Sequence, residues 1–294
     1  MLFELSPCGA AYQWYVRPEH TPWSKIGDGP EGPEVKTMAD DLAFLCDSHL
    51  LAIDIPVGSA KLRVDGTVYG RTPFLVVRVW ASGKKVLIEA DDGRLVVFSL
   101  GMTGRLLTTE LNHTRATLEF GTNYGSFVVL DQRVYFDDSR KFGSMVQFND
   151  LSEFHREYKL GPDVLEAAIL GQVLAPSCFR QEKRAICKVL LAQEVVAGIG
   201  NYLKSDILYA SGVHPEERVS SLSEATKALI LKNAAAIILD SYRKGGYTMS
   251  DYLRPSGAVG TYMPICYGQA SMTKLKTSDG RVSYIDESRQ VLSG

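Results

Sequence analysis

The 294-residue chain lacks several features that would assign it to a class at once. Its five cysteines are odd in number and scattered, and no C-x-x-C pair occurs, so we expect a reduced setting without a structural zinc site. No run approaches the roughly 18 apolar residues that cross a bilayer, so we expect no membrane partner. The first 29 residues carry Glu4 early and have no basic start, which predicts an intracellular protein that is not secreted.

The chain also has no large excess of positive or negative charge, since its formal net charge is only −2. This value does not indicate a nucleic-acid-binding protein, but it does not exclude one, since such binding needs only a local basic face. A hydrophobic content of 45% and a charged content of 22% are typical of a globular protein. The length allows one large domain or two ordinary ones.

The first half of the chain is predicted to be mostly β-structure after one helix. Residues 1–29 have no sustained periodicity and read as an irregular extension. A helix is predicted from Pro33, because proline suits a first helical turn and apolar residues follow at helical spacing. The predicted strands are 51–57, 74–80, 85–90, 95–100, 115–120, 126–130 and 133–136. The DDG run at 91–93 predicts a hairpin turn, so residues 30–150 read as a sandwich or barrel.

The second half is predicted to be mainly helical. Apolar residues recur at helical spacing in 180–193, 202–210 and 222–242, and residues 150–165 read as the connection between the halves. Glycines and prolines return after position 245, where 262–267 and 281–285 are predicted as the two strands of a terminal hairpin. The chain is therefore divided into 1–29, 30–150, 151–245 and 246–294.

Five motifs with chemical character occur in order along the chain. They are PEGPEV at 30–35, SGKK at 82–85, LGMTG at 100–104 together with DSRKFG at 138–143, LLAQEVVAGIGNY at 190–202, and CYG at 266–268 followed by KTSDGR at 276–281. Gly198 and Gly200 allow a ligand to approach the backbone closely. Asn201 stands where a helix would begin, so its side chain and the free amide groups there can bind a phosphate.

Together the motifs resemble the formamidopyrimidine-DNA glycosylase / endonuclease VIII (Fpg/Nei) family over residues 30–290. The resemblance implies an α+β protein with an N-terminal helix plus a catalytic β-sandwich domain, then a helical helix-two-turns-helix DNA-binding domain. Residues 246–294 would form a lesion loop and a finger hairpin. Many members end in a four-cysteine zinc finger, but Cys266 stands alone here. The tail is therefore similar to the zinc-less finger of the Nei-like branch, with no metal and no organic cofactor.

The activity that the resemblance implies is that of a bifunctional DNA glycosylase and abasic-site lyase (β/δ-elimination) acting on oxidised bases. Pro30 matches the nucleophile, Glu31 the proton shuttle, Glu34 a supporting carboxyl group and Lys84 an assisting cation. A secondary amine can expel a base from C1′ and leave an iminium ion, an electron sink that favours elimination of the neighbouring phosphates. A nearby carboxyl group can carry protons to the sugar oxygen.

The resemblance also implies residues that hold DNA. An enzyme that extrudes a base leaves a hole, which an apolar side chain, a planar multi-donor side chain and an aromatic wedge can fill. The matching residues are Met102, Arg140 and Phe142. The predicted phosphate contacts are Lys84, Asn201 and Arg281. We expect a monomer that binds double-stranded DNA containing damaged bases or abasic sites, in the nucleus or another DNA-containing compartment.

Pro30 departs from the family pattern because 29 residues precede it. The nitrogen of an internal proline is a tertiary amide without a usable lone pair, so the chain as written has the signature but not the amine. Two alternatives therefore stay open: a catalytically blocked homologue that binds damaged DNA, and a general nucleic-acid-binding protein. The void-filling set argues against the second, because a protein that leaves the duplex stacked needs no such residues. Ser99, where a histidine is often found, is a smaller departure.

Overall fold

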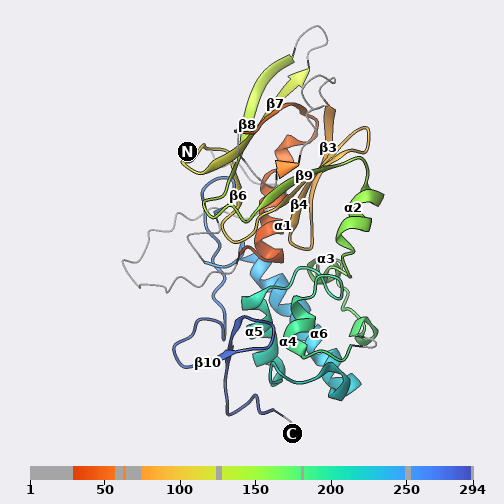
Figure 1. Cartoon of the computed structure of the whole chain (residues 1–294), viewed down its shortest axis with the longest axis vertical. Helices are drawn as coiled ribbons and strands as arrows, with labels where there is room; N and C mark the ends of the chain where they lie inside the picture. The colour runs from red at the N-terminus through yellow and green to blue at the C-terminus, as the bar shows by residue number, and fades with distance from the viewer. Residues whose placement is uncertain are drawn as a thin grey trace, which may run out of the picture.

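The computed structural model describes residues 29–56, 62–63, 74–123, 128–179, 182–248 and 253–292 (Figure 1). The predicted irregular extension lies outside these residues, apart from its last position. Most of the strands gather at the top of Figure 1, whereas a short strand near the C-terminus lies with most of the helices at the bottom, and the first helix lies between the two groups. No helix in the described ranges is long and apolar enough to cross a membrane.

Helix α1 (Gly32–Asp41) begins as the sequence predicts, with Pro33 in its first turn. A capping box precedes it, in which the side chains of Glu31 and Glu34 each accept a hydrogen bond from the other residue's backbone. A 3₁₀ turn, η1 (Ala43–Leu45), extends the helix. The predicted apolar face is buried, as Val35 and Met38 show, and it packs into the core of the β-structure.

Nine strands form one sheet in the order β2-β9-β5-β4-β3-β1-β7-β8-β6. All described pairings are antiparallel except β2 with β9. The sheet folds over on itself, because Phe98 of β5 and Phe136 of β8 pack edge to face with ring centroids 5.5 Å apart. The strands are β1 (His49–Asp54), β2 (Leu62–Arg63), β3 (Phe74–Ser82), β4 (Lys85–Ala90), β5 (Leu95–Ser99), β6 (Arg105–Leu107), β7 (Thr114–Asn123), β8 (Val128–Asp137) and β9 (Ser144–Phe148).

The second half of the chain is built from short helices around a separate apolar core. The helices are α2 (Leu151–Tyr158), α3 (Val164–Ile169), α4 (Ile186–Leu191), α5 (Asn201–Ser211) and α6 (Glu224–Arg243), with 3₁₀ turns η3 (Pro176–Phe179) and η4 (Val219–Ser221). A two-stranded hairpin of β10 (Thr273–Lys276) and β11 (Val282–Ile285) follows. Tyr284 of β11 packs on Tyr267 and so joins the hairpin to the helical core.

Several local predictions are wrong for identifiable reasons. Among the described residues of the helix predicted over 180–193, only α4 is helical. Beyond its C-terminal end, the side chain of Gln193 donates to the Leu191 and Ile199 carbonyls and accepts from the Gly198 amide. Residues 262–267 are not a strand of the hairpin, since the amides of 265–267 donate to the carboxylate of Asp206. Helix α2 lies within the predicted connection, and β8 replaces two predicted strands. The predicted four-part division stays a prediction.

Candidate active site and nucleic-acid interface

Glu31 joins the start of α1 to the start of α5. Its carboxylate accepts hydrogen bonds from the backbone amides of Gly200 at 2.8 Å, Tyr202 at 2.9 Å and Leu203 at 3.3 Å. These amides belong to the first turn of α5, where donors lack helical partners and the helix dipole favours a negative charge. A Cβ atom on Gly200 would lie 2.2 Å from the carboxyl carbon of Glu31. Glycine is therefore required at this position for the carboxylate to reach the helix.

Glu34 lies one turn further along α1 and is also buried. Its carboxylate accepts hydrogen bonds from the Glu31 amide at 2.8 Å, the Tyr202 hydroxyl at 2.9 Å and the Tyr247 amide at 2.6 Å. Burial raises the pKa of the Glu34 carboxyl group, and these hydrogen bonds offset part of that effect. A Cβ atom on Gly246 would lie 2.7 Å from its Oε1 atom. The two carboxyl groups thus occupy the junction between the β-structure and the helical part.

Pro30 is buried directly before this junction. The amide of Gly32 donates to the carbonyl of Gly198 at 2.8 Å, which places the first motif against the fourth. A Cβ atom on Gly29 would lie 1.7 Å from the Gly101 carbonyl oxygen and 2.9 Å from the Met102 Cα atom. Three motifs that are far apart in the sequence therefore meet around Pro30.

The three predicted void-filling residues lie together on two loops. Arg140 approaches Met102 with 3.6 Å between Nη1 and Sδ, and its guanidinium carbon lies 5.6 Å from the ring centroid of Phe142. Phe142 is 52% exposed. Large apolar side chains are usually buried, so this exposure indicates a functional surface. The loops follow β5 and β8, so the sheet holds this cluster beside the residues around Pro30.

Lys84 lies in the turn between β3 and β4, and this turn also contacts the helical part. The amide of Gly83, with φ near +58°, donates to Asp163 Oδ2 at 2.7 Å. Asp163 was not singled out in the sequence, although its position before a helical segment marks it as a cap, and it caps α3. The neighbouring Lys85 donates to Ser99 Oγ at 2.6 Å, and burial lowers the pKa of its amine to about 8.

The structure also brings Asn201 and Arg281 together. The side-chain amide of Asn201 donates to the carbonyl of Val282 at 3.0 Å, directly after Arg281. A second contact, which the sequence did not suggest, is a buried ion pair with 2.5 Å between Lys204 Nζ and Asp279 Oδ2. No local sequence pattern marks this pair, because Lys204 is followed directly by two further polar residues. This ion pair anchors the hairpin in addition to its apolar and hydrogen-bonded contacts.

Asp279 supports the turn that carries Arg281. Its Oδ1 atom accepts hydrogen bonds from the Arg281 amide at 2.9 Å and the Thr277 hydroxyl at 2.7 Å. Burial alone would raise the pKa of Asp279, but the ammonium group of Lys204 and these hydrogen bonds hold it below its ordinary value. Among the described residues, no group of three or more His, Cys, Asp or Glu side chains could hold a metal ion.

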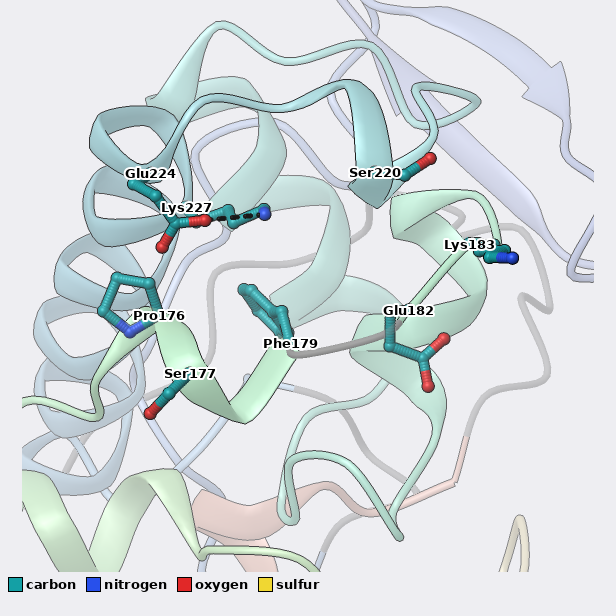
Figure 2. Close-up of a pocket in the computed structure, with 8 residues that line it drawn as sticks. All are labelled: Pro176, Ser177, Phe179, Glu182, Lys183, Ser220, Glu224 and Lys227. Carbon is teal, nitrogen blue, oxygen red and sulfur yellow. Dashed lines mark hydrogen bonds and ion pairs between the residues drawn. The ribbon is translucent and has the colours of Figure 1, made fainter.

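A pocket of about 430 Å³ lies between η3, η4 and α6, apart from this junction (Figure 2). Phe179 lies within it, and Lys227 is paired with Glu224 at 2.8 Å. It shares no residue with the candidate site. Its lysines and glutamates balance in charge, so it does not indicate a particular ligand.

The fold, in which a β-structure precedes a helical part, defines a class of protein: a helix-two-turns-helix DNA-repair enzyme. The chain matches the model of the formamidopyrimidine-DNA glycosylase N-terminal domain over residues 29–145. It matches the formamidopyrimidine-DNA glycosylase H2TH domain over residues 160–252. The chain belongs to the formamidopyrimidine-DNA glycosylase family, and the family and the fold class predicted from the motifs are confirmed.

Known proteins support this assignment. The chain is 31% identical over 241 residues to the formamidopyrimidine-DNA glycosylase of Novosphingobium aromaticivorans, covering 79% of this chain and 86% of the relative. It is 29% identical over 237 residues to that of Salmonella newport, covering 79% and 85%. The crystal structure of the MutM (Fpg) protein from Thermus thermophilus superposes with a TM-score of 0.76 at 25% identity, covering 90% of this chain and all of the other. The Nei-like branch stays a prediction.

Proposed function

We propose that the chain, once it begins at Pro30, is a bifunctional DNA glycosylase and abasic-site lyase of base-excision repair that removes oxidised bases from double-stranded DNA. The observation that carries this proposal is the meeting of three motifs around Pro30. The Gly198 carbonyl lies on one side of this segment, and the loop bearing Met102 lies on the other. Family membership and the names of the relatives agree with it.

In the proposed reaction, the secondary amine of a terminal Pro30 attacks C1′ of the damaged nucleotide. The C1′–N bond breaks, the base leaves with a proton, and the sugar opens to an iminium ion. Loss of a C2′ proton then expels the 3′ phosphate, a second elimination expels the 5′ phosphate, and water releases the amine. Glu31 carries protons to the sugar oxygen, and Glu34 supports it from the next turn of α1.

The remaining site residues hold the DNA. Lys84, Asn201 and Arg281 contact phosphates around the lesion, and the Met102, Arg140 and Phe142 side chains fill the space that the extruded base leaves. We also propose that the protein belongs to the Nei-like branch, which favours oxidised pyrimidines. The lone Cys266 supports this proposal, because many relatives carry four zinc-binding cysteines in this tail. We further propose that the protein acts as a monomer in the nucleus or another DNA-containing compartment, with the domain limits given above.

Borohydride trapping on abasic-site DNA tests the proposal. A chain that starts at Pro30 should form a covalent complex, because reduction fixes the iminium ion. The full-length chain should bind the same DNA but trap weakly, since its Pro30 nitrogen is an amide. Acetylation of the new terminus is the matched control, because it removes the lone pair and little else. Equal trapping by both chains would show that a side-chain amine reacts, and the assignment of Pro30 would be wrong.

A second candidate function is damage binding without catalysis, and the contact made by Gly29 favours it. The backbone before Pro30 lies close to Gly101 and Met102, so in a chain that keeps Gly29 the Pro30 nitrogen is an amide and Gly29 fills the space beside it. The mass of the protein isolated from its own host separates the two functions. A mass that matches a chain starting at Pro30 supports the enzyme, whereas the full-length mass supports the binding protein.

A further inference from the structure

Asp138 is a buried carboxylate that joins the two loops bearing the void-filling residues. Its Oδ1 atom accepts a hydrogen bond from Thr103 Oγ1 at 2.6 Å, next to Met102. Its Oδ2 atom accepts one from the Gly143 amide at 2.7 Å, next to Phe142. The side chain is only 1% exposed, so it lies beneath the loops and not on the surface that DNA would contact.

Further contacts make this carboxylate the centre of a small network. Arg115 Nη1 lies 3.3 Å from Asp138 Oδ2 and also donates to the carbonyl of Gly143 at 3.1 Å. The amide of Arg140 donates to Thr103 Oγ1 at 3.1 Å, so Thr103 links the second loop to the first. Each void-filling residue is therefore adjacent to, or part of, a backbone segment that the network holds.

We propose that Asp138 is the positioning residue that holds Met102, Arg140 and Phe142 as one unit, so that preference for damaged DNA depends on a carboxylate that touches no DNA. The inference rests on the proposed function, which assigns void filling to these three side chains. Surface loops lose conformational freedom when they insert into a duplex, and a preorganised pair of loops loses less. Loss of the network should weaken insertion while leaving phosphate contacts intact.

Asp138→Asn is the direct test, because asparagine keeps the shape but has only one acceptor oxygen. It cannot accept hydrogen bonds from both the Thr103 hydroxyl and the Gly143 amide. Asp137→Asn is the matched control. Asp137 is adjacent, equally buried and also ion-paired, but it binds Arg105 and the His113 amide instead of the loops. Two quantities are measured on the full-length chain, which should bind abasic-site DNA without reacting efficiently: the ratio of affinities for abasic-site and undamaged duplexes, and the fluorescence of 2-aminopurine opposite the abasic site.

Asp138→Asn should lower the affinity ratio about tenfold, the effect of one lost hydrogen bond to a charged group, and reduce the fluorescence change. Affinity for undamaged DNA and the salt dependence should stay unchanged. Asp137→Asn should keep the wild-type ratio. A wild-type ratio in folded Asp138→Asn would overturn the inference. If that variant does not fold, two variants of Thr103 replace it. Thr103→Val should lower the affinity ratio, whereas Thr103→Ser should keep the wild-type ratio. Equal ratios for these two variants would overturn the inference.

The same measurements distinguish failure of the proposed function from failure of the role of Asp138. If the unmodified protein binds abasic-site and undamaged duplexes equally, no void is filled, and both proposals are wrong. If the unmodified protein prefers abasic-site DNA and both asparagine variants keep that preference, only the role of Asp138 is wrong.

Discussion

Replacement of Lys204 by methionine tests whether the buried ion pair anchors the C-terminal hairpin. Lys204 is fully buried and the Asp279 side chain is 3% exposed, so methionine would leave a buried carboxylate without its cation. Breaking such a pair costs about 3–5 kcal/mol. The Thr277 and Arg281 donors still reach Asp279, which favours the lower end, about 3 kcal/mol of unfolding free energy.

Urea denaturation of the full chain measures this change, and Lys244→Met is its control. Lys244 forms an exposed pair with Asp240 on α6, whose loss should cost less than about 1 kcal/mol. The double variant Lys204→Met/Asp279→Asn should be more stable than Lys204→Met, because no unpaired charge remains. Equal losses for Lys204→Met and Lys244→Met would refute the anchoring role.

The same pair gives a pH dependence with a definite sign. The pKa of Asp279 is held below its ordinary value of 3.8, so the folded state binds its proton less readily than the unfolded chain. The stability that Asp279 contributes is therefore complete above the ordinary carboxyl pKa and is lost as the pH falls through the lowered value. The stability difference between wild type and Asp279→Asn should accordingly be constant near neutral pH and shrink below pH 3.8. A difference that grows on acidification would contradict this reasoning.

Three further predictions concern the junction and the DNA. Gly200→Ala places a Cβ atom 2.2 Å from the Glu31 carboxyl carbon and should lower thermal stability and abolish trapping; a native melting temperature with full trapping would contradict this. Lys84→Ala and Arg281→Ala should each reduce the log–log salt slope of duplex binding by about one, whereas Asn201→Ala should weaken binding without changing it. Chelator treatment should leave thermal stability and DNA binding unchanged; loss of both together with stoichiometric zinc would contradict this.

The sequence predicts the parts of the fold that depend on local periodicity and turn residues. The apolar face of α1, the β4–β5 hairpin and the start of α5 at Asn201 all follow from such patterns. The helix over 180–193 and the strand over 262–267 were wrong, because their backbones are held by Gln193 and Asp206. Side-chain hydrogen bonds of this kind leave no periodic signal, so apolar spacing alone continues through them.

In the candidate site, too, the sequence predicts what local motifs show and misses what distant side-chain contacts determine. The motif residues could be selected because their chemistry and order resemble a family, and the structure brings Met102, Arg140 and Phe142 together. Asp138 and Asp279 stand inside two of the motifs, but the partners that their carboxylates bind could not be predicted this way. Asp138 binds a residue 35 positions away, and Asp279 pairs with a lysine 75 positions away. Nothing local in the sequence shows that these two side chains are buried or which residues they bind.

Identification of the amine that bonds to DNA tests the central claim most directly. The chain starting at Pro30 is reduced with borohydride on abasic-site DNA, digested with nuclease and protease, and mapped by mass spectrometry. The account predicts that the sugar remnant lies on the N-terminal Pro30 nitrogen. Lys84 and Lys85 are the side-chain amines that could compete, and burial lowers the pKa of the Lys85 amine to about 8. A remnant on either lysine, with Pro30 unmodified, would contradict the account.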